Sequence, residues 1–124
     1  MKLRSWPRTG LLVVVALIAA ACGGDDELFA DAGTGSVAEY SFTVPAGSGE
    51  AMDRGEQLDI LPRELEVRVG EVLELVNLDD RGHLIGPFFV GKGETVRQQF
   101  RSPGQFVGAC SVHPSGEFVL TVVE

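Results

Sequence analysis

The chain has 124 residues and a formal net charge of −8, from 18 acidic and 10 basic residues. This length is enough for one small domain with a single hydrophobic core. The acidity argues against binding to nucleic acid, which needs clustered basic residues, and against electrostatic adhesion to anionic lipid.

The first 21 residues are predicted to be an export signal. A membrane-spanning helix needs about 20 apolar residues, whereas the apolar stretch 10–21 has only 12. This stretch follows a start that carries positive charge and no acidic residue, as signal peptides do: Lys2, Arg4 and Arg8. We therefore expect residues 1–21 to direct export and to be removed.

The residues in front of Cys22 resemble the lipobox of bacterial lipoproteins. Ala19, Ala20 and Ala21 are small, as in that motif, although Ala19 stands where leucine is commonest. In that family the cysteine is lipidated and becomes the first mature residue. The resemblance implies that Cys22 anchors the protein to the cell membrane, on its extracytoplasmic side. The alternative is an ordinary signal peptide that leaves Cys22 free.

Removal of residues 1–21 would make the chain more acidic. The remaining 103 residues keep every acidic residue and lose three basic ones, so the formal net charge becomes −11. Residues 22–37 are rich in glycine and aspartate and show no periodicity. They are predicted to form a flexible tether with a reach of about 20 Å, followed by one folded domain over residues 38–124.

Alternation of apolar and polar residues predicts that this domain is built from strands. Seven short strands are expected, at 40–44, 64–69, 72–77, 83–87, 95–100, 105–110 and 118–123. No convincing amphipathic helix interrupts them, which indicates a small antiparallel or mixed β-sandwich. The connector 45–62 is longer than most loops, and such loops are usually functional or disordered. Its second half carries apolar residues that we expect to pack back onto the sandwich: Leu58, Ile60 and Leu61.

Cysteine usage points to a metal. If Cys22 carries lipid, Cys110 has no disulfide partner in the chain. Export would place this thiol in an oxidising compartment, where it must be buried or held by something. The only two histidines are His83 and His113, and a His2Cys set is typical of blue copper sites. The simpler interpretation is that Cys110 is a small buried core residue.

Three segments together resemble the cupredoxins, the plastocyanin and amicyanin family of small blue-copper proteins. They are Asn77–His83, Ser102–Phe106 and Gly108–Pro114. The resemblance covers roughly residues 62–124, with 38–44 as a plausible first strand. It implies a Greek-key β-sandwich that holds one copper ion.

In that family the metal is held by an upstream histidine, a cysteine and the histidine three places after it. The matching positions in this sequence are His83, Cys110 and His113. The resemblance implies that these three side chains are the copper ligands. Zinc, held by the same residues with Glu117 or water, is the less favoured metal.

The sequence departs from the family at the axial position, where a methionine usually follows the second histidine. Residues 114–118 contain none, and the only methionine outside the signal is Met52. Three arrangements therefore stay open: an apolar neighbour such as Phe118, an oxygen of Glu117, or a weakly bound backbone carbonyl. Met52 itself is the least favoured candidate.

Two surface features also have alternative interpretations. Residues 86–90 are either core or part of an apolar docking patch in which Pro87 or Phe88 joins Pro114. The turn at 79–81 is predicted to be solvated. The acidity fits either solubility beside a membrane or a basic protein partner.

The sequence thus predicts a membrane-tethered, mononuclear, type 1-like copper protein that transfers single electrons outside the cytoplasm to a redox protein partner. The alternatives are copper binding or delivery to an exported oxidase, and a metal-free binding module of the same fold. Two histidines are too few for multicopper enzymes, and one available cysteine excludes a binuclear copper centre. With no convincing catalytic triad or phosphate-binding loop, we expect neither enzymatic activity nor a small-molecule substrate.

Overall fold

The computed structural model describes residues 29–124. The predicted signal peptide 1–21 and the predicted lipidation site Cys22 lie outside the described residues. Within the described range, no helix has the length and apolar character needed to cross a membrane.

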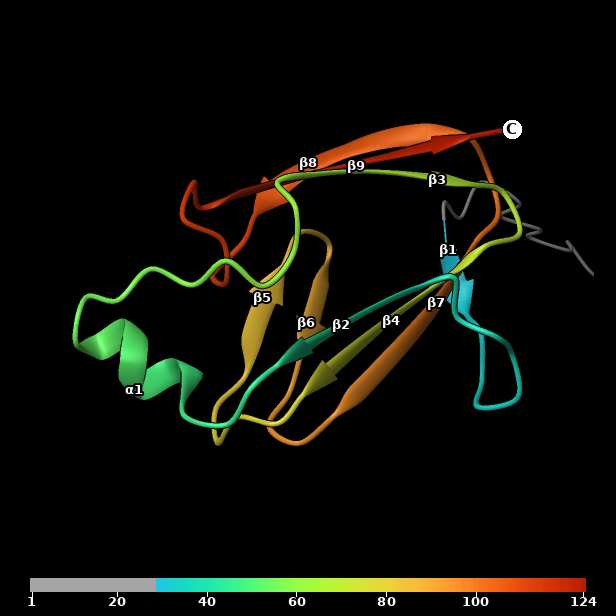
Figure 1. Cartoon of the computed structure of the whole chain (residues 1–124). Coiled ribbons are helices and arrows are strands. Elements are labelled where there is room, and N and C mark those ends of the chain that lie inside the picture. Colours follow the sequence, from blue (N-terminus) through green and yellow to red (C-terminus); the bar gives the residue numbers. More distant parts are fainter. Residues whose placement is uncertain (1–28) are drawn as a thin grey trace, which may run out of the picture.

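Nine strands and one short helix make up the regular structure of residues 29–124 (Figure 1). In chain order the elements of residues 29–124 are β1 (Phe29–Asp31), β2 (Tyr40–Val44), α1 (Ser48–Asp53), β3 (Glu64–Arg68), β4 (Val72–Asn77), β5 (His83–Ile85), β6 (Phe88–Val90), β7 (Thr95–Phe100), β8 (Gly104–Ala109) and β9 (Glu117–Val123).

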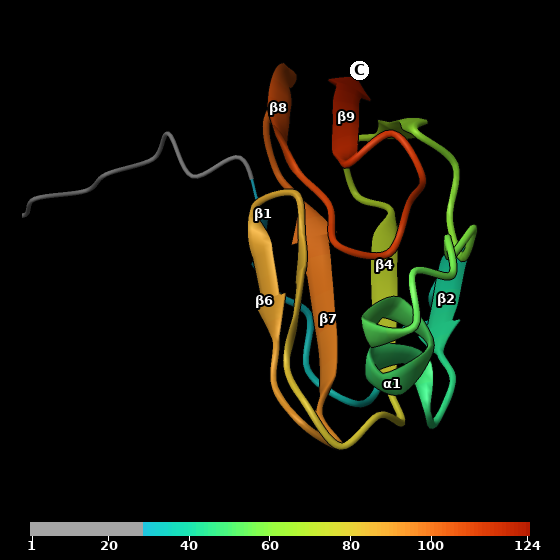
Figure 2. The same ribbon diagram turned by 90° about the vertical axis from the view of Figure 1, so that its left-hand side faces the viewer.

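The strands form two facing layers and a hairpin. One sheet has the order β1-β7-β4-β2, the other has the order β3-β9-β8, and β5 pairs with β6 (Figures 1 and 2). The pairs β2–β4 and β3–β9 are parallel, and the remaining pairs are antiparallel. The predicted all-β sandwich is confirmed, and its sheets are of the mixed type.

Period-2 alternation explains how the layers bury their inner faces. In β3 the inward residues are Leu65 and Val67, and in β9 they are Phe118, Leu120 and Val122. These side chains meet Leu73, Leu75 and Phe100 from the other sheet in one core cluster.

Two short strands were not predicted. β1 lies inside the segment that was expected to be a tether, and it pairs with β7. The folded part therefore begins before residue 38. Phe29 of β1 packs edge-on against Phe88, with ring centroids 4.9 Å apart. β6 follows β5 after a tight turn at Gly86, whereas the sequence indicated a single strand there. Strands of three residues are too short to show a period.

The connector 45–62 contains the helix α1, which the sequence did not predict. Six residues give less than two turns, so no amphipathic pattern can develop. Its second half packs back onto the sandwich as expected: Leu61 is buried, while Leu58 and Ile60 are partly buried against the core.

Tyr40 allows a test of the contact between β2 and the residue that precedes β4. Its hydroxyl donates a hydrogen bond of 3.0 Å to Glu71. Burial, and then this bond, raise the pKa of Tyr40 above its usual value of 10.0. Because the fold favours the protonated phenol, this contribution to stability is complete below about pH 10 and is lost as the pH rises through the folded-state pKa.

We therefore expect the free energy of unfolding to fall less steeply with rising pH in Tyr40→Phe than in the unsubstituted protein. Tyr40 is the only tyrosine in the chain, so tyrosinate absorbance titrates it directly. A titration midpoint for Tyr40 in the folded protein that lies at or below its midpoint in the unfolded chain would contradict the prediction.

Candidate metal centre

Backbone hydrogen bonds join the end of β5 to the end of β8 and the residues that follow it. Ser111 N–H donates to the Leu84 carbonyl at 2.9 Å, and Gly86 N–H donates to the Ala109 carbonyl at 2.8 Å. Between these two bonds, Ile85 and Cys110 form a β-bridge. The segment that begins at His83 is thereby fixed beside the segment that carries Cys110.

Cys110 is a free and buried cysteine, 3% exposed. Its N–H donates to the Gly116 carbonyl at 2.9 Å, and Gly116 N–H donates to the His113 carbonyl at 2.9 Å, which closes the loop 110–116. Burial raises the pKa of the Cys110 thiol, while hydrogen bonds from the backbone of Val112 and His113 oppose that rise. The sulfur is thus hidden from solvent, and without a metal its surroundings favour the neutral thiol over the thiolate.

His83 is buried, with its side chain 1% exposed. Its Nε2 lies 2.7 Å from Oδ2 of Asp79, and its Nδ1 lies 3.3 Å from the hydroxyl oxygen of Ser111. Ser111 directly follows Cys110, so the Nδ1 edge of the ring faces the cysteine loop.

Asp79 corrects the interpretation of residues 79–81 as a solvated turn. Asp80 and Arg81 are exposed, but Asp79 is only 2% exposed. Its carboxylate accepts hydrogen bonds from Gly47 N–H at 3.2 Å and from Gly49 N–H at 2.8 Å. Burial alone would raise the pKa of Asp79, but the bonds from His83 and from backbone amides outweigh it and lower the pKa from 3.8 to about 2.

Sequence reasoning therefore missed one residue of the candidate site. Three successive polar residues usually mark a solvated turn, and this pattern hid the buried member. The only available signal was the position of Asp79 four residues before a histidine already selected as a ligand.

His113, the other predicted histidine ligand, contacts Ser115 in its own loop and an exposed carboxylate. Its Nδ1 accepts a hydrogen bond from Ser115 N–H at 3.0 Å and lies 2.7 Å from the Ser115 hydroxyl. Its Nε2 lies 3.8 Å from the exposed carboxylate of Asp59. Within residues 29–124, no three side chains of His, Cys, Asp or Glu are grouped so that they could hold a metal ion.

The axial candidates lie in different surroundings. Glu117 pairs with Arg63 at 2.7 Å on the surface, where its carboxylate is 41% exposed. Phe118 is fully buried, and a Cβ added to Gly86 would lie 2.6 Å from its ring. Gly86 also has a φ of 56°, so the turn after β5 admits no larger side chain without strain. Met52 lies on α1.

Residues 86–90 divide between core and surface. Phe88 is 5% exposed and belongs to the core cluster, so this residue is not part of a patch. Leu84 and Phe89 are opposite each other across the β5–β6 hairpin and are 42% and 66% exposed. Pro87 is partly buried and Pro114 is exposed, so a docking patch formed by these two residues stays a prediction.

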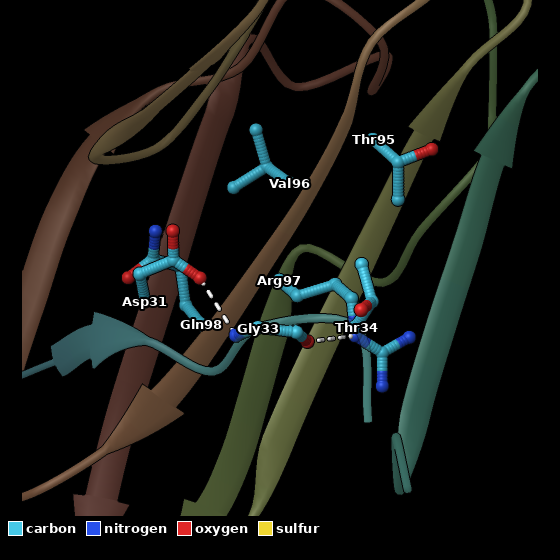
Figure 3. Close-up of a pocket in the computed structure, with 7 residues that line it drawn as sticks. All are labelled: Asp31, Gly33, Thr34, Thr95, Val96, Arg97 and Gln98. Carbon is cyan, nitrogen blue, oxygen red and sulfur yellow. Dashed lines mark hydrogen bonds between the residues drawn. The ribbon is translucent and has the colours of Figure 1, made fainter. Parts of the chain in front are cut away.

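A separate pocket of about 270 Å³ lies where the turn after β1 meets β7 (Figure 3). Gly33 N–H donates to Asp31 at 2.7 Å, and the Arg97 Nε–H donates to the Gly33 carbonyl at 2.9 Å. No histidine or cysteine lines this pocket. It takes no part in the candidate metal centre.

No protein-family model and no curated protein matches the chain. Among solved structures, amicyanin from Paracoccus versutus is 14% identical, with 78% of this chain and 99% of that chain covered and a TM-score of 0.49. A purple cupredoxin from Nitrosopumilus maritimus is 21% identical, with 68% and 100% covered and a TM-score of 0.44.

A copper-containing nitrite reductase from Thermus scotoductus is 23% identical over 77% of this chain and 25% of its own, with a TM-score of 0.44. Amicyanin and the purple cupredoxin belong to the family that the sequence resembles. These likenesses concern the course of the chain, and the roles of individual residues rest on the geometry described above.

The donor chemistry of the site fits copper better than it fits a hard cation. Soft or borderline metals prefer thiol and imidazole donors. The site offers a buried thiol, and an imidazole with one ring nitrogen facing the loop that carries the thiol. His113 is the third donor in the sequence, and its Nδ1 is engaged by Ser115. Its participation would require the ring to leave that contact.

Proposed function

We propose that this protein is a mononuclear, type 1-like copper protein that transfers single electrons outside the cytoplasm. His83, Cys110 and His113 would hold the ion. The proposal also includes lipidation of Cys22, which would keep the domain at the extracytoplasmic face of the cell membrane.

The junction of β5 with residues 109–111 carries this proposal. Two backbone hydrogen bonds and a β-bridge hold the His83 segment against the Cys110 segment. Both side chains are almost completely buried. Two soft or borderline donors on separate, hydrogen-bonded segments form the kind of rigid frame that metal sites need.

When bound, copper would supply a one-electron couple between Cu(II) and Cu(I). The protein's contribution would be to restrict movement of the ligands between the two states. Cys110 is restrained by the closed loop 110–116, and His83 is restrained by Asp79. Exclusion of water from both donors would further limit reorganisation.

Titration of the purified protein with Cu(II), followed by visible absorption and electron paramagnetic resonance, tests the proposal. We expect one copper per chain and an intense thiolate-to-copper absorption band. A parallel titration with Zn(II), which gives no colour, shows by competition whether the same site is used. No colour at one equivalent of copper would overturn the electron-transfer proposal.

A metal-free binding module is the second candidate. The observation in its favour is that His113 directs Nδ1 to Ser115, and that residues 29–124 show no group of three donors. Copper delivery to an exported oxidase would use the same ligands. It predicts that a competing chelator removes copper readily, whereas an electron carrier retains it.

The anchor and the partner need separate tests. The anchor is tested by labelling the protein with fatty acid in cells. Label that is incorporated into the unsubstituted protein but not into Cys22→Ser would support lipidation of Cys22, and label that persists in Cys22→Ser would contradict it. A redox protein is the proposed partner, and a basic one suits the acidic chain. Electron transfer to such a partner should then slow as ionic strength rises.

A further inference from the structure

We propose that Asp79 is a positioning residue that fixes the ring of His83, and that the first turn of α1 holds Asp79 in place. This inference extends the proposed function, because it concerns the ligand His83. It also assigns a role to the connector 45–62, which the sequence left without one.

Several hydrogen-bond donors meet at the Asp79 carboxylate. Gly47 N–H and Gly49 N–H donate to it from the start of α1, and His83 Nε2 lies 2.7 Å from it. A backbone N–H can only donate, and an ionised carboxylate can only accept. The convergence of these groups therefore suits a carboxylate and no other side chain of this size.

The contacts of the His83 ring favour one of its two neutral tautomers. Because Nε2 faces the carboxylate, the proton of the uncharged imidazole belongs on Nε2. Nδ1 is then left with a free lone pair, directed toward Ser111 at 3.3 Å. Metal-binding histidines commonly donate their second ring N–H to a carboxylate in this way.

Asp79 is itself held from several sides. Its N–H donates to the side chain of Asn77 at 3.0 Å. Asn77 is fully buried, and its Nδ2 lies 2.8 Å from the Arg81 carbonyl and 3.1 Å from the Val90 carbonyl. The loop between β4 and β5 is thus tied to the end of the β5–β6 hairpin.

The connector completes this support. Arg81 forms two hydrogen bonds with Asp53 at the end of α1, at 3.1 and 2.9 Å. A Cβ added to Gly49 would lie 2.1 Å from Arg81 Nε, so the helix and this side chain are in close contact. Further along, Ile60 N–H donates to the Val112 carbonyl at 3.3 Å. The connector therefore contacts both the residue that orients His83 and the loop that carries Cys110 and His113.

The test begins with the protein without added metal. Long-range proton–nitrogen correlation spectra distinguish the two tautomers of each histidine. We expect His83 to carry its proton on Nε2. An Nδ1–H tautomer of His83 in the unsubstituted protein would overturn the proposal, whether or not any variant folds.

The second arm compares Asp79→Asn with Asp80→Asn, the same change one position later at an exposed residue. The amide introduced by Asp79→Asn would place an NH₂ group where a second acceptor oxygen is needed. We expect this variant to shift His83 toward the Nδ1–H tautomer and to weaken Cu(II) binding by about 10–100-fold. Asp80→Asn should change neither.

An unchanged tautomer in a folded Asp79→Asn variant, or copper affinity within about twofold of the unsubstituted protein, would overturn the positioning role, since loss of such a partner typically costs far more. The two proposals fail differently. If the unsubstituted protein binds no copper, the proposed function is wrong, while the tautomer measurements still decide the role of Asp79.

Discussion

Replacing Cys110 by serine is expected to abolish the visible absorption of the Cu(II)-loaded protein. The band arises from charge transfer between a thiolate and copper, and serine offers a hydroxyl that stays protonated and binds copper weakly. The side chains differ by one atom, so the buried site keeps nearly the same shape. Absorption spectra and metal analysis at one equivalent of copper measure the effect.

The chain provides a matched control for this change. Cys22 is the only other cysteine, so Cys22→Ser makes the same chemical change at a position outside the proposed site. We expect its spectrum to equal that of the unsubstituted protein. A Cys110→Ser variant that keeps its colour, or a Cys22→Ser variant that loses it, would refute the proposed ligand set.

Replacing Phe118 by alanine is expected to lower the free energy of unfolding by about 3–5 kcal/mol. Phe118 is fully buried between the two sheets, and its ring lies against Gly86 in the turn after β5. Its loss would leave a cavity beneath the junction that joins β5 to residues 109–111. Because domains of this size are stable by only about 5–15 kcal/mol, such a loss would remove a large part of the total free energy of unfolding.

Phe89→Ala is the matched control for this prediction. It removes the same side chain from the outer face of β6, where Phe89 is 66% exposed. Surface substitutions usually change stability by no more than about 0.5 kcal/mol. Urea unfolding of both variants measures the difference, and equal losses of stability would contradict the position of Phe118 in the core.

Strand positions were predicted well because alternation is a local property of the chain. The strands at 40–44, 72–77 and 95–100 have the predicted bounds. In β9, alternate residues face the core over the whole strand, so burial could be inferred from the sequence. The short strands β1 and β6 and the helix α1 were missed because each is held by tertiary contacts and is too short for a period.

The candidate site was only partly predictable for the same reason. Composition identifies the residues with metal-binding chemistry, since the chain has only two histidines and one cysteine outside the predicted lipidation site. It does not determine which ring nitrogen of each histidine is available. Contacts with Asp79 and Ser115 decide that.

The sequence by itself thus determined an all-β sandwich and a short set of candidate ligands, because alternation and residue chemistry can be read along the chain. Only the tertiary structure decided that Asp79 is buried, that Phe88 belongs to the core, and that the connector contacts the site. Each of these depends on residues far apart in sequence. The partner of Asp79 at Gly49 is 30 positions away, and no local pattern encodes a contact at that separation.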